Sequence, residues 1–349
     1  MGSSSCKRVF IRTDANAFVA SGHVMRCLAL ADALRNAGMD VVFVVSDETP
    51  RTIIEGRGFS ARVLASDWRN IMDGVGRMRD ACKACAITPI VLVDTYCVTA
   101  EYVEALADVA RVCYLGSKKD DLGNLSLLVN YSTMIDEEFY RAVYEPRGTR
   151  LLLGAQYAPL AERFGNQKQR EIHRVSKVLV TTGNTDPYGF VTLFLSRALQ
   201  TEELQEVSYE VVVGGMFEND HEIAAMANSN HNVHVNFRVK DMAALMAQCD
   251  AAVSANGTTV YELAAMGVAP VTFAMVDEQK PSAQSLARLG AIAYAGAVSN
   301  GIDGVVAQAI KLLADLVNCP LKAQELAARA HGLIDGKGAQ RIAKEISLL

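Results

Sequence analysis

Several features that would place this chain in a familiar class of protein are missing from its sequence. No basic run stands out among the 34 Lys and Arg, and 39 Asp and Glu leave a formal net charge of −5, which argues against a nucleic acid as partner. No apolar run is long enough to cross a bilayer, and residues 1–6 do not have the basic and apolar regions of a signal peptide. We therefore expect a cytoplasmic protein without stable membrane insertion.

The cysteines do not form a metal-binding pattern. There are eight of them, and without a secretory signal they are expected to be reduced thiols. Cys82 and Cys85 make one CxxC in a stretch expected to be helical, but no second pair follows at the spacing of a zinc site. We interpret the pair as structural or incidental, and we expect the protein to need neither a metal nor a cofactor.

Short apolar runs alternate with amphipathic stretches along most of the 349 residues. Near-continuous β-branched runs between helices are typical of parallel strands that are buried on both faces. Strand–helix alternation of this kind predicts an α/β protein, and the chain length predicts two Rossmann-like domains. The runs occur at residues 9–11, 41–45, 90–93, 178–180, 211–213, 251–253 and 271–273.

The alternation is interrupted once, between about residues 122 and 174, where clear helices are lost. We place the domain boundary near Phe164. This predicts an N-terminal domain of residues 1–164 and a C-terminal domain of residues 165–349. A final helix is expected at residues 339–346, and its packing back on the N-terminal domain is left open.

Polar residues follow the first expected strand. It ends in Arg12 and Asp14, and the next loop leads to Gly22 and His23 at the start of a helix. Ligands bind α/β folds at this edge of the sheet, and the free amides of a helix N-terminus attract anions. An imidazole beside them is favoured in its neutral form, which suits a general base. The alternative is that His23 only caps or packs the helix.

A second polar group follows the strand at residues 90–93. Asp94 ends this strand, and Tyr96 comes two residues later. We expect both to lie near His23, where a carboxylate, a phenol and an imidazole make a water-activating cluster. The alternatives are that Asp94 caps a helix at residues 98–106 and that Tyr96 is a rim residue.

Two loops in the second half are expected to bind an anion. One carries Gly183 and Asn184, whose small and polar character lets the backbone approach an anion closely. The other leads from a strand end at Ser254 to a helix beginning near Thr258, whose amides and hydroxyls can grip a diphosphate without metal. Glu262, one turn into that helix, is expected to accept two hydrogen bonds from a ribose diol. Its alternative is an ordinary first-turn carboxylate.

Taken in this order, the motifs resemble a known family. The segment from Arg12-x-Asp14 to Gly22-His23-Val24-Met25-Arg26-Cys27-Leu28 is similar to the signature of the UDP-sugar hydrolases of pseudaminic acid biosynthesis. The resemblance continues through Asp94-x-Tyr96 and residues 153–157, 183–187 and 256–262, so it covers nearly the whole chain. The Gly-His-Val-Met-Arg-Cys string is specific. The C-terminal segment is shared with many GT-B nucleotide-sugar enzymes, including the lipid II-forming N-acetylglucosaminyltransferases.

The resemblance implies a GT-B architecture with a UDP-sugar in an inter-domain cleft. It also implies hydrolysis of UDP-2,4-diacetamido-2,4,6-trideoxy-β-L-altrose to the free sugar and UDP, with inversion at the anomeric carbon and without metal. His23 would activate the water, and Tyr96 and Asp14 would line the sugar site. We expect a monomer or weak oligomer whose partner is this substrate.

Further residues are expected to bind the substrate on the same basis. Met242 lies in a loop that resembles the family's uracil-binding segment, and Gln279 is expected to bind the sugar or to cap a helix. The full binding set is Arg12, Gly22, Asp94, Gly183, Asn184, Met242, Ser254, Asn256, Gly257, Thr258, Glu262 and Gln279.

Three departures from the family pattern, and two other functions, leave the assignment open. Asn184 and Asn256 stand where the family usually has glycine, although asparagine tolerates left-handed backbone geometry. Asp277-Glu278-Gln279 stands where Asn-Gln is usual, which leaves the exact sugar open. The alternatives to a hydrolase are a GT-B glycosyltransferase, with a hydroxyl acceptor in place of water, and a non-catalytic sensor of nucleotide sugars.

Overall fold

The computed structural model describes residues 7–16, 22–167 and 171–349. Part of the loop before Gly22 and part of the polar stretch near the expected boundary therefore lie outside the described residues. The chain divides into two units, one of Met1–Glu162 with Lys337–Leu349 and one of Arg163–Gly336. The sequence placed residues 165–349 in the second domain and left open whether the final helix packs back on the first; the segment Lys337–Leu349 belongs to the first unit.

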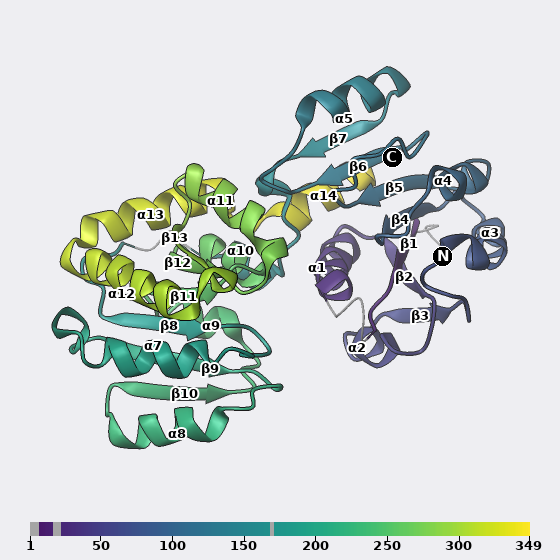
Figure 1. Ribbon diagram of the computed structural model, residues 1–349. Coiled ribbons are helices and arrows are strands. Elements are labelled where there is room, and N and C mark those ends of the chain that lie inside the picture. Colours follow the sequence, from purple (N-terminus) through teal and green to yellow (C-terminus); the bar gives the residue numbers. More distant parts are fainter. Residues whose placement is uncertain (1–6, 17–21, 168–170) are drawn as a thin grey trace. The chain divides into compact units, whose positions relative to one another are not determined.

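A parallel sheet of seven strands forms the centre of the first unit (Figure 1). Its order is β3-β2-β1-β4-β5-β6-β7. Alternate residues of its central strands enter two different apolar clusters, so the sheet is buried on both faces, which is why its strands are near-continuous apolar runs. The strands are β1 (Arg8–Thr13), β2 (Asp40–Val45), β3 (Ser60–Val63), β4 (Ile90–Asp94), β5 (Arg111–Leu115), β6 (Leu127–Asn130) and β7 (Arg150–Leu153).

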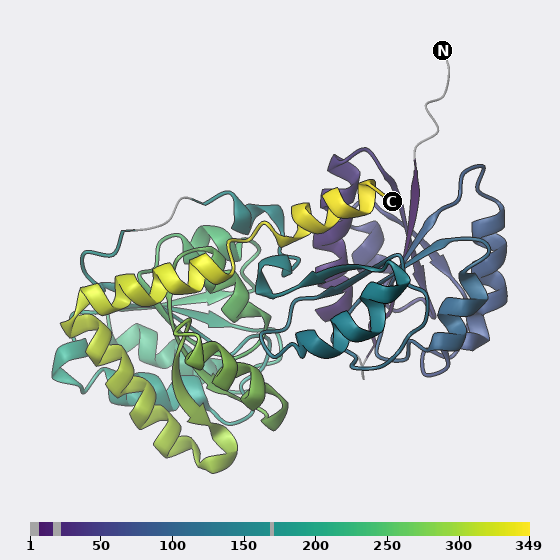
Figure 2. The ribbon, with the colours of Figure 1, turned by 90° about the horizontal axis from the view of Figure 1, so that it is seen from above.

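Helices cover both faces of this sheet. One apolar cluster contains residues of α1 (Gly22–Asn36) and α14 (Gly338–Ser347), and Figure 2 shows these two helices side by side. The other cluster contains residues of α3, α4 and α5. The remaining helices of the unit are α2 (Arg51–Glu55), α3 (Val75–Lys83), α4 (Ala100–Leu106), α5 (Glu137–Tyr144) and, across the boundary, α6 (Glu162–Gly165), with short 3-10 turns at Ile71–Gly74, Glu145–Arg147 and Ala155–Tyr157.

The expected loss of helices between residues 122 and 174 was wrong. This stretch contains β6, α5 and β7. Asp136 caps α5, its Oδ1 accepting from the Phe139 amide at 3.1 Å, and Tyr140 and Tyr144 are buried beneath it. The helix escaped notice because two tyrosines, whose hydroxyls make them polar in a sequence pattern, form its apolar face.

The C-terminal helix α14 joins the first unit through a close backbone approach. Gly338 begins this helix, and a Cβ atom at that position would lie 2.2 Å from the Ala158 carbonyl oxygen. Only glycine permits the two backbones to come so near. Behind it, Ala339, Ile342 and Ile346 are buried in the same apolar cluster as α1.

The second unit repeats the plan with a parallel sheet of order β10-β9-β8-β11-β12-β13. Its strands are β8 (Lys177–Thr181), β9 (Ser208–Val213), β10 (Val233–Phe237), β11 (Ala251–Ala255), β12 (Ala269–Ala274) and β13 (Ala293–Ala297). Its helices are α7 (Phe190–Ala198), α8 (Asp220–Ser229), α9 (Met242–Met246), α10 (Thr258–Ala265), α11 (Lys280–Arg288), α12 (Ile302–Asn318) and α13 (Pro320–Leu333), with 3-10 turns at Glu202–Leu204, Asp277–Gln279 and Val298–Asn300. The expectation of two Rossmann-like α/β domains is confirmed.

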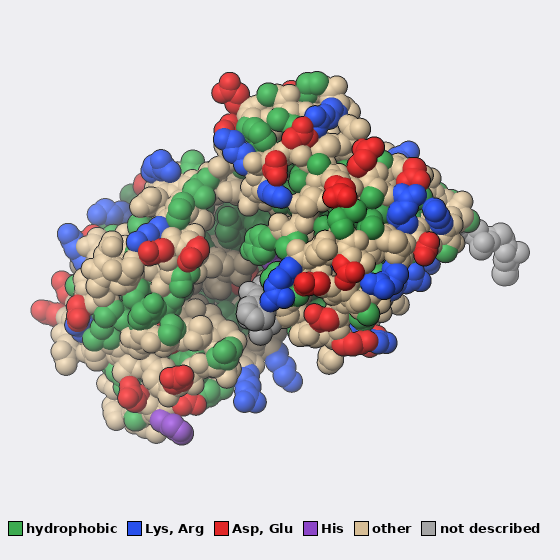
Figure 3. Space-filling view, turned by 45° about the vertical axis from the view of Figure 1, so that its right-hand side comes forward, with side chains coloured by type: hydrophobic (Ala, Val, Ile, Leu, Met, Phe, Trp, Pro, Cys, Tyr) green, Lys and Arg blue, Asp and Glu red, His purple; other side chains and the backbone are tan. Residues whose placement is uncertain are grey.

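The surface carries charges of both signs. On the face drawn in Figure 3, basic and acidic side chains are intermixed. Within the described part of the chain, no single helix is both long and apolar enough to cross a membrane, and α12 with the segment Pro320–Ser347 passes that test only as a pair bent by 107°. The described residues also contain no cluster of three His, Cys, Asp or Glu side chains that is suited to a metal ion.

Candidate functional site

One candidate site lies in the first unit, where β1 and β4 end. The two strands pair in parallel, with Thr13 opposite Asp94. Helix α1 begins at Gly22 after the loop that follows β1. Because the carboxyl ends of parallel strands meet at one edge of the sheet, His23 and Asp94 are brought together from distant parts of the sequence.

His23 and Asp94 form a buried pair. The imidazole Nδ1 lies 2.6 Å from Asp94 Oδ1, and both side chains are buried. A carboxylate only accepts, so Nδ1 carries the proton and donates it. The neighbouring Arg26 Nη2, 2.9 Å from Nδ1, cannot then donate to that nitrogen. The lone pair is therefore on Nε2, which has no hydrogen-bond partner among the described residues.

Asp94 is held by two further donors. Arg26 binds both of its oxygens, with Nε 2.7 Å from Oδ2 and Nη2 on Oδ1, and the Cys27 thiol donates to Oδ2 at 3.1 Å. Burial alone would raise the pKa of Asp94, but the charge and hydrogen bonds of Arg26, with those of His23, lower it. Asp94 is therefore a carboxylate that orients His23. It does not cap α4, which Thr99 caps, and its expected contact with the substrate stays a prediction.

Tyr96 lies over the imidazole. Its ring centroid is 4.5 Å from that of His23, and the two rings meet edge to face at 76°. The Tyr96 side chain is 72% exposed whereas His23 is 5% exposed. The Tyr96 phenol is therefore exposed to solvent beside the buried imidazole, where it can contact a reactant that approaches His23.

Arg12 and Asp14 turn away from this site. Arg12 Nη1 lies 2.6 Å from Asp14 Oδ2, and Nη2 lies 2.6 Å from the Ser46 hydroxyl. The other oxygen of Asp14 accepts from the Ser46 amide at 2.7 Å, and both charged side chains are buried. The pair ties β1 to the end of β2. The Asp14 oxygens accept within this internal pair and from the Ser46 amide, whereas Arg12 Nε has no hydrogen-bond partner among the described residues. The roles expected for these two residues in the sugar site stay predictions.

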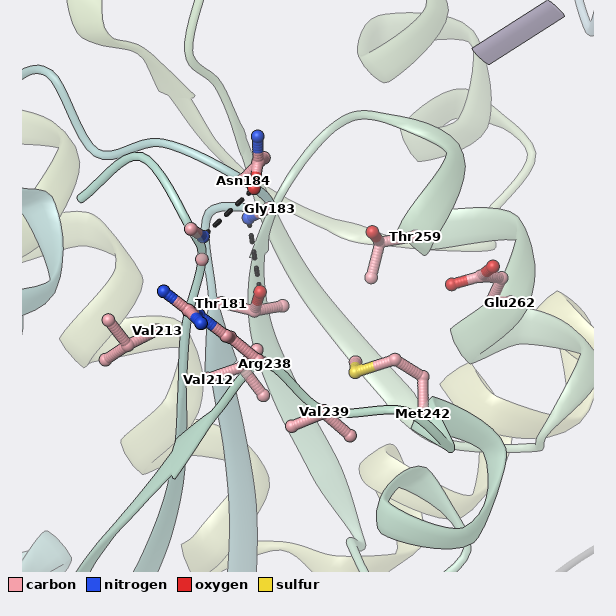
Figure 4. A pocket seen from close by; sticks show the side chains of 12 residues that line it. Thr181, Gly183, Asn184, Val212, Val213, Arg238, Val239, Met242, Thr259 and Glu262 are labelled. Atoms are coloured by element: carbon pink, nitrogen blue, oxygen red, sulfur yellow. Dashed lines mark hydrogen bonds between the residues drawn. The ribbon is translucent and has the colours of Figure 1, made fainter. Parts of the chain in front are cut away.

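A second candidate site is a cavity of about 490 Å³ in the second unit (Figure 4). It lies at the carboxyl ends of β8, β9 and β10 and beside the start of α10. Its floor is apolar, and its polar groups stand around that floor. The lining residues are Thr181, Gly183, Asn184, Val212, Val213, Gly214, Gly215, Arg238, Val239, Met242, Thr259 and Glu262.

Glu262 is the only carboxylate among these lining residues. Burial raises its pKa to about 7, although Arg163 works in the opposite direction. Figure 4 shows its side chain on the side of the cavity opposite Arg238, with Met242 between them. Met242 begins α9 and does not lie in a loop. A carboxyl placed in this way can accept hydrogen bonds from a diol.

Gly183 and Asn184 shape one wall of the cavity. Gly183 has φ +93°, a backbone conformation that suits glycine, so the left-handed residue of this loop is the glycine and not the asparagine. The Asn184 Oδ1 accepts from the Gly215 amide at 3.0 Å. At Gly214 a Cβ atom would lie 2.5 Å from the Asn184 backbone. The Asn184 side chain therefore links two loops at the cavity. Its backbone lies so close to position 214 that only glycine fits there.

The loop before α10 contributes less to the cavity than expected. Ser254 is buried and donates to the Ala255 carbonyl at 3.0 Å. Gln279 accepts from the Met275 amide at 2.8 Å. Asn256 is buried, and its Oδ1 has no hydrogen-bond partner among the described residues. None of these, nor Gly257 or Thr258, lines the cavity, and Thr259 takes the place expected for Thr258.

Comparison with known proteins identifies the fold of this chain. No family model matches the chain. The structure superposes on MurG of Acinetobacter baumannii with a TM-score of 0.67 and 15% identity, over 98% of this chain and all of that one. It superposes on UDP-GlcNAc 2-epimerase of Neisseria meningitidis, bound to UDP-GlcNAc, with a TM-score of 0.66 and 12% identity, again over 98% and 100%. The chain has the GT-B fold.

Two curated relatives match part of the sequence. The chain is 26% identical over 204 residues to the spore coat polysaccharide biosynthesis protein SpsG of Bacillus subtilis, which is 57% of this chain and 59% of SpsG. It is 21% identical over 273 residues to the uncharacterized protein MJ1062 of Methanocaldococcus jannaschii, 75% of this chain and 54% of the relative. The matches thus span between half and three-fifths of these relatives, and they indicate distant homology to SpsG.

Sequence reasoning missed several residues of the two candidate sites. Arg26 belongs to the recognised motif but was given no role. The signal that could have found it is its spacing of three residues from His23, which places both side chains on one face of the helix. Tyr131, whose hydroxyl accepts from Arg26 at 2.9 Å, had no local signal. Arg238 has φ +48°, unusual for a residue with a side chain, and this strain is visible only in the structure.

Proposed function

We propose that this GT-B protein hydrolyses a UDP-linked 2,4-diacetamido-2,4,6-trideoxyhexose to the free sugar and UDP, in nonulosonic (pseudaminic) acid biosynthesis. The observation that carries the proposal is the His23–Asp94 pair, which leaves the imidazole Nε2 as a base without a protein partner among the described residues. The motif resemblance supplies the substrate class. The distant relative SpsG bears a name from polysaccharide biosynthesis, and the epimerase and the pneumococcal O-GlcNAc transferase of the same fold are described with bound UDP-sugar or UDP.

The cavity of the second unit supports a nucleotide site. Its apolar floor of Val212, Val239 and Met242 suits a uracil ring. Glu262 faces the same space and suits the two hydroxyls of a ribose. The backbone at Gly183 and the guanidinium of Arg238 suit the diphosphate, since both are donors to an anion.

The chemistry takes place at His23. In the proposed step a water oxygen bonds to the anomeric carbon while the bond from that carbon to the UDP oxygen breaks. The water proton passes to His23 Nε2, and the bonding electron pair leaves with UDP. Attack opposite the leaving group inverts the anomeric centre. Asp94 keeps the imidazole in the required tautomer, and Tyr96 contacts the sugar.

Three further expectations belong to the proposal. The protein acts in the cytoplasm as a monomer or weak oligomer, and it takes neither a cofactor nor a metal. In the proposed mechanism donors to the diphosphate stabilise the leaving group electrostatically.

The test is release of UDP from candidate UDP-sugars with no acceptor present and with a chelator added. Turnover with inversion at the anomeric carbon supports the hydrolase. UDP release that occurs only when a hydroxyl acceptor is added contradicts the hydrolase and indicates a glycosyltransferase with the same fold. Binding of UDP-sugar without turnover under either condition indicates a non-catalytic sensor of nucleotide sugars.

A further inference from the structure

A positively charged side chain, that of Arg26, lies beside the buried His23–Asp94 pair. Arg26 binds both oxygens of Asp94, and its remaining nitrogen, Nη1, donates to the Tyr131 hydroxyl at 2.9 Å. The guanidinium is thus held at all three nitrogens. Its side chain is 20% exposed, and Asp94 is fully buried.

Two consequences follow from this clamp. Bidentate binding prevents the carboxylate from rotating, so Oδ1 stays aimed at His23 Nδ1. The positive guanidinium also offsets the negative carboxylate. Without that offset, a buried carboxylate 2.6 Å from an imidazole would stabilise the imidazolium, which has no lone pair on Nε2 and cannot act as a base.

The other groups around the imidazole do not supply this balance. Three other titratable side chains contact the cluster, namely Cys27 from α1, Tyr96 after β4 and Tyr131 after β6, and Tyr114 from β5 interacts with Asp94 and Arg26 electrostatically. Burial raises the pKa of Cys27, Tyr114 and Tyr131, which keeps these three neutral. None of these four side chains carries a positive charge, so the charge that offsets Asp94 is that of Arg26.

We propose that Arg26 is a positioning residue for His23, which keeps the imidazole a neutral, Nδ1-protonated base by neutralising and orienting Asp94. This inference rests on the proposed function only in naming His23 as the base. The state of the imidazole can be measured without any turnover.

The experiment is a pH titration of histidine ring nitrogens by NMR in ¹⁵N-histidine-labelled full-length protein, with the His23 signals assigned by His23→Gln. Arg26→Met removes the charge, and Arg26→Gln removes it while keeping one donor for Asp94, in case the first variant does not fold. In either variant the midpoint of the His23 titration should rise by about one pH unit or more. Arg26→Lys, which keeps the charge, should restore most of the difference.

Two matched controls separate charge from packing. Tyr131→Phe removes the hydrogen bond to Arg26 but no charge, so the His23 midpoint should stay in place. Arg8→Met removes an arginine from an exposed ion pair with Asp40 at the start of β1, and it should change neither the midpoint nor the tautomer.

Activity provides a second readout. The acidic limb of the kcat/KM profile should move to higher pH in Arg26→Met by the same amount as the NMR midpoint, with KM little changed. A folded Arg26→Met or Arg26→Gln protein whose His23 midpoint does not rise overturns the proposal. A raised midpoint in a protein that hydrolyses no UDP-sugar leaves the role of Arg26 intact and overturns the proposed hydrolase instead.

Discussion

Asp94 Oδ1 lies 2.6 Å from His23 Nδ1 although 71 positions separate the two residues. The contact exists because β1 and β4 are neighbours and because Asp94 has the same strand parity as Ile90 and Leu92, which pack on the face that α1 covers. A strand alternates its side chains between faces, so a shift by one residue would have turned Asp94 away from the helix.

Replacement of His23 by Ala should abolish the base and preserve the nucleotide site. We expect kcat to fall by about 10²- to 10⁴-fold, with UDP affinity unchanged, because His23 does not line the cavity assigned to the nucleotide. Steady-state kinetics and calorimetric titration with UDP measure the two effects. The control is His221→Ala, an exposed histidine of α8, which should behave as the unmodified protein. A large loss of UDP affinity in His23→Ala would contradict the assignment.

Replacement of Glu262 by Gln should have the reverse pattern. The amide keeps the size of the side chain but loses one charged acceptor, so UDP affinity should fall by about 10- to 100-fold while kcat at saturation changes little. In the unmodified protein, UDP affinity should increase as pH rises through about 7, since loss of the proton makes both carboxylate oxygens charged acceptors for the diol. Calorimetry between pH 5.5 and 8.5 tests this, and a pH-independent affinity argues against the ribose role.

The same carboxyl should make stability without ligand depend on pH. The pKa of Glu262 is about 7 in the fold against 4.5 ordinarily. Its proton is bound more tightly in the folded state, so its contribution is full below about pH 4.5 and is lost as pH rises through 7. Glu262→Gln should therefore gain on the order of 2 kcal/mol relative to the unmodified protein between pH 5 and pH 8. Denaturant unfolding at both pH values measures this, and parallel pH curves for the two proteins would exclude it.

Arg238 should contribute to anion binding in the cavity. Arg238→Ala is expected to weaken UDP by about tenfold and uridine much less, because the guanidinium is assigned to the phosphates. Lys240→Ala is the matched control, since Lys240 is a basic residue of the same segment that does not line the cavity. Equal losses for UDP and uridine would place Arg238 at the base or sugar instead.

Gly338 should be needed for the attachment of α14. Gly338→Ala places a Cβ atom against the Ala158 carbonyl and should lower the free energy of unfolding by about 1–3 kcal/mol. The control in the same unit is Gly76→Ala in α3, where no atom lies within 4 Å of the added Cβ, and a small gain in stability is expected. Thermal unfolding of both variants measures the difference, and equal melting temperatures would show that the contact relaxes without cost.

Much of the fold could be predicted from the sequence because it depends on local patterns. Buried β-branched runs revealed the central strands of both sheets, and polar residues directly after them marked the edge where ligands bind. The stretch with β6, α5 and β7 was lost because a helix whose apolar face consists of Tyr140 and Tyr144 has a weak local signal.

The candidate sites were predicted only in part, because the position of a residue at the edge of a sheet does not determine the direction in which its side chain points. Arg12 has the strand parity of Phe10, which packs beneath α3 and α4, and thus lies on the face opposite α1. The sequence placed Asp14 in the sugar site, yet Arg12 and Ser46 use both of its oxygens. Likewise Ser254 and Gln279 bond to nearby backbone and do not reach the cavity.

By itself the sequence determined the central strands with the helices between them and the polar residues that follow those strands, since these depend on neighbours along the chain. The tertiary structure decided which of those residues meet. Strand pairing and the helix that covers each face bring Asp94, His23 and Arg26 into one hydrogen-bonded cluster, and such contacts depend on packing between segments that no local pattern encodes.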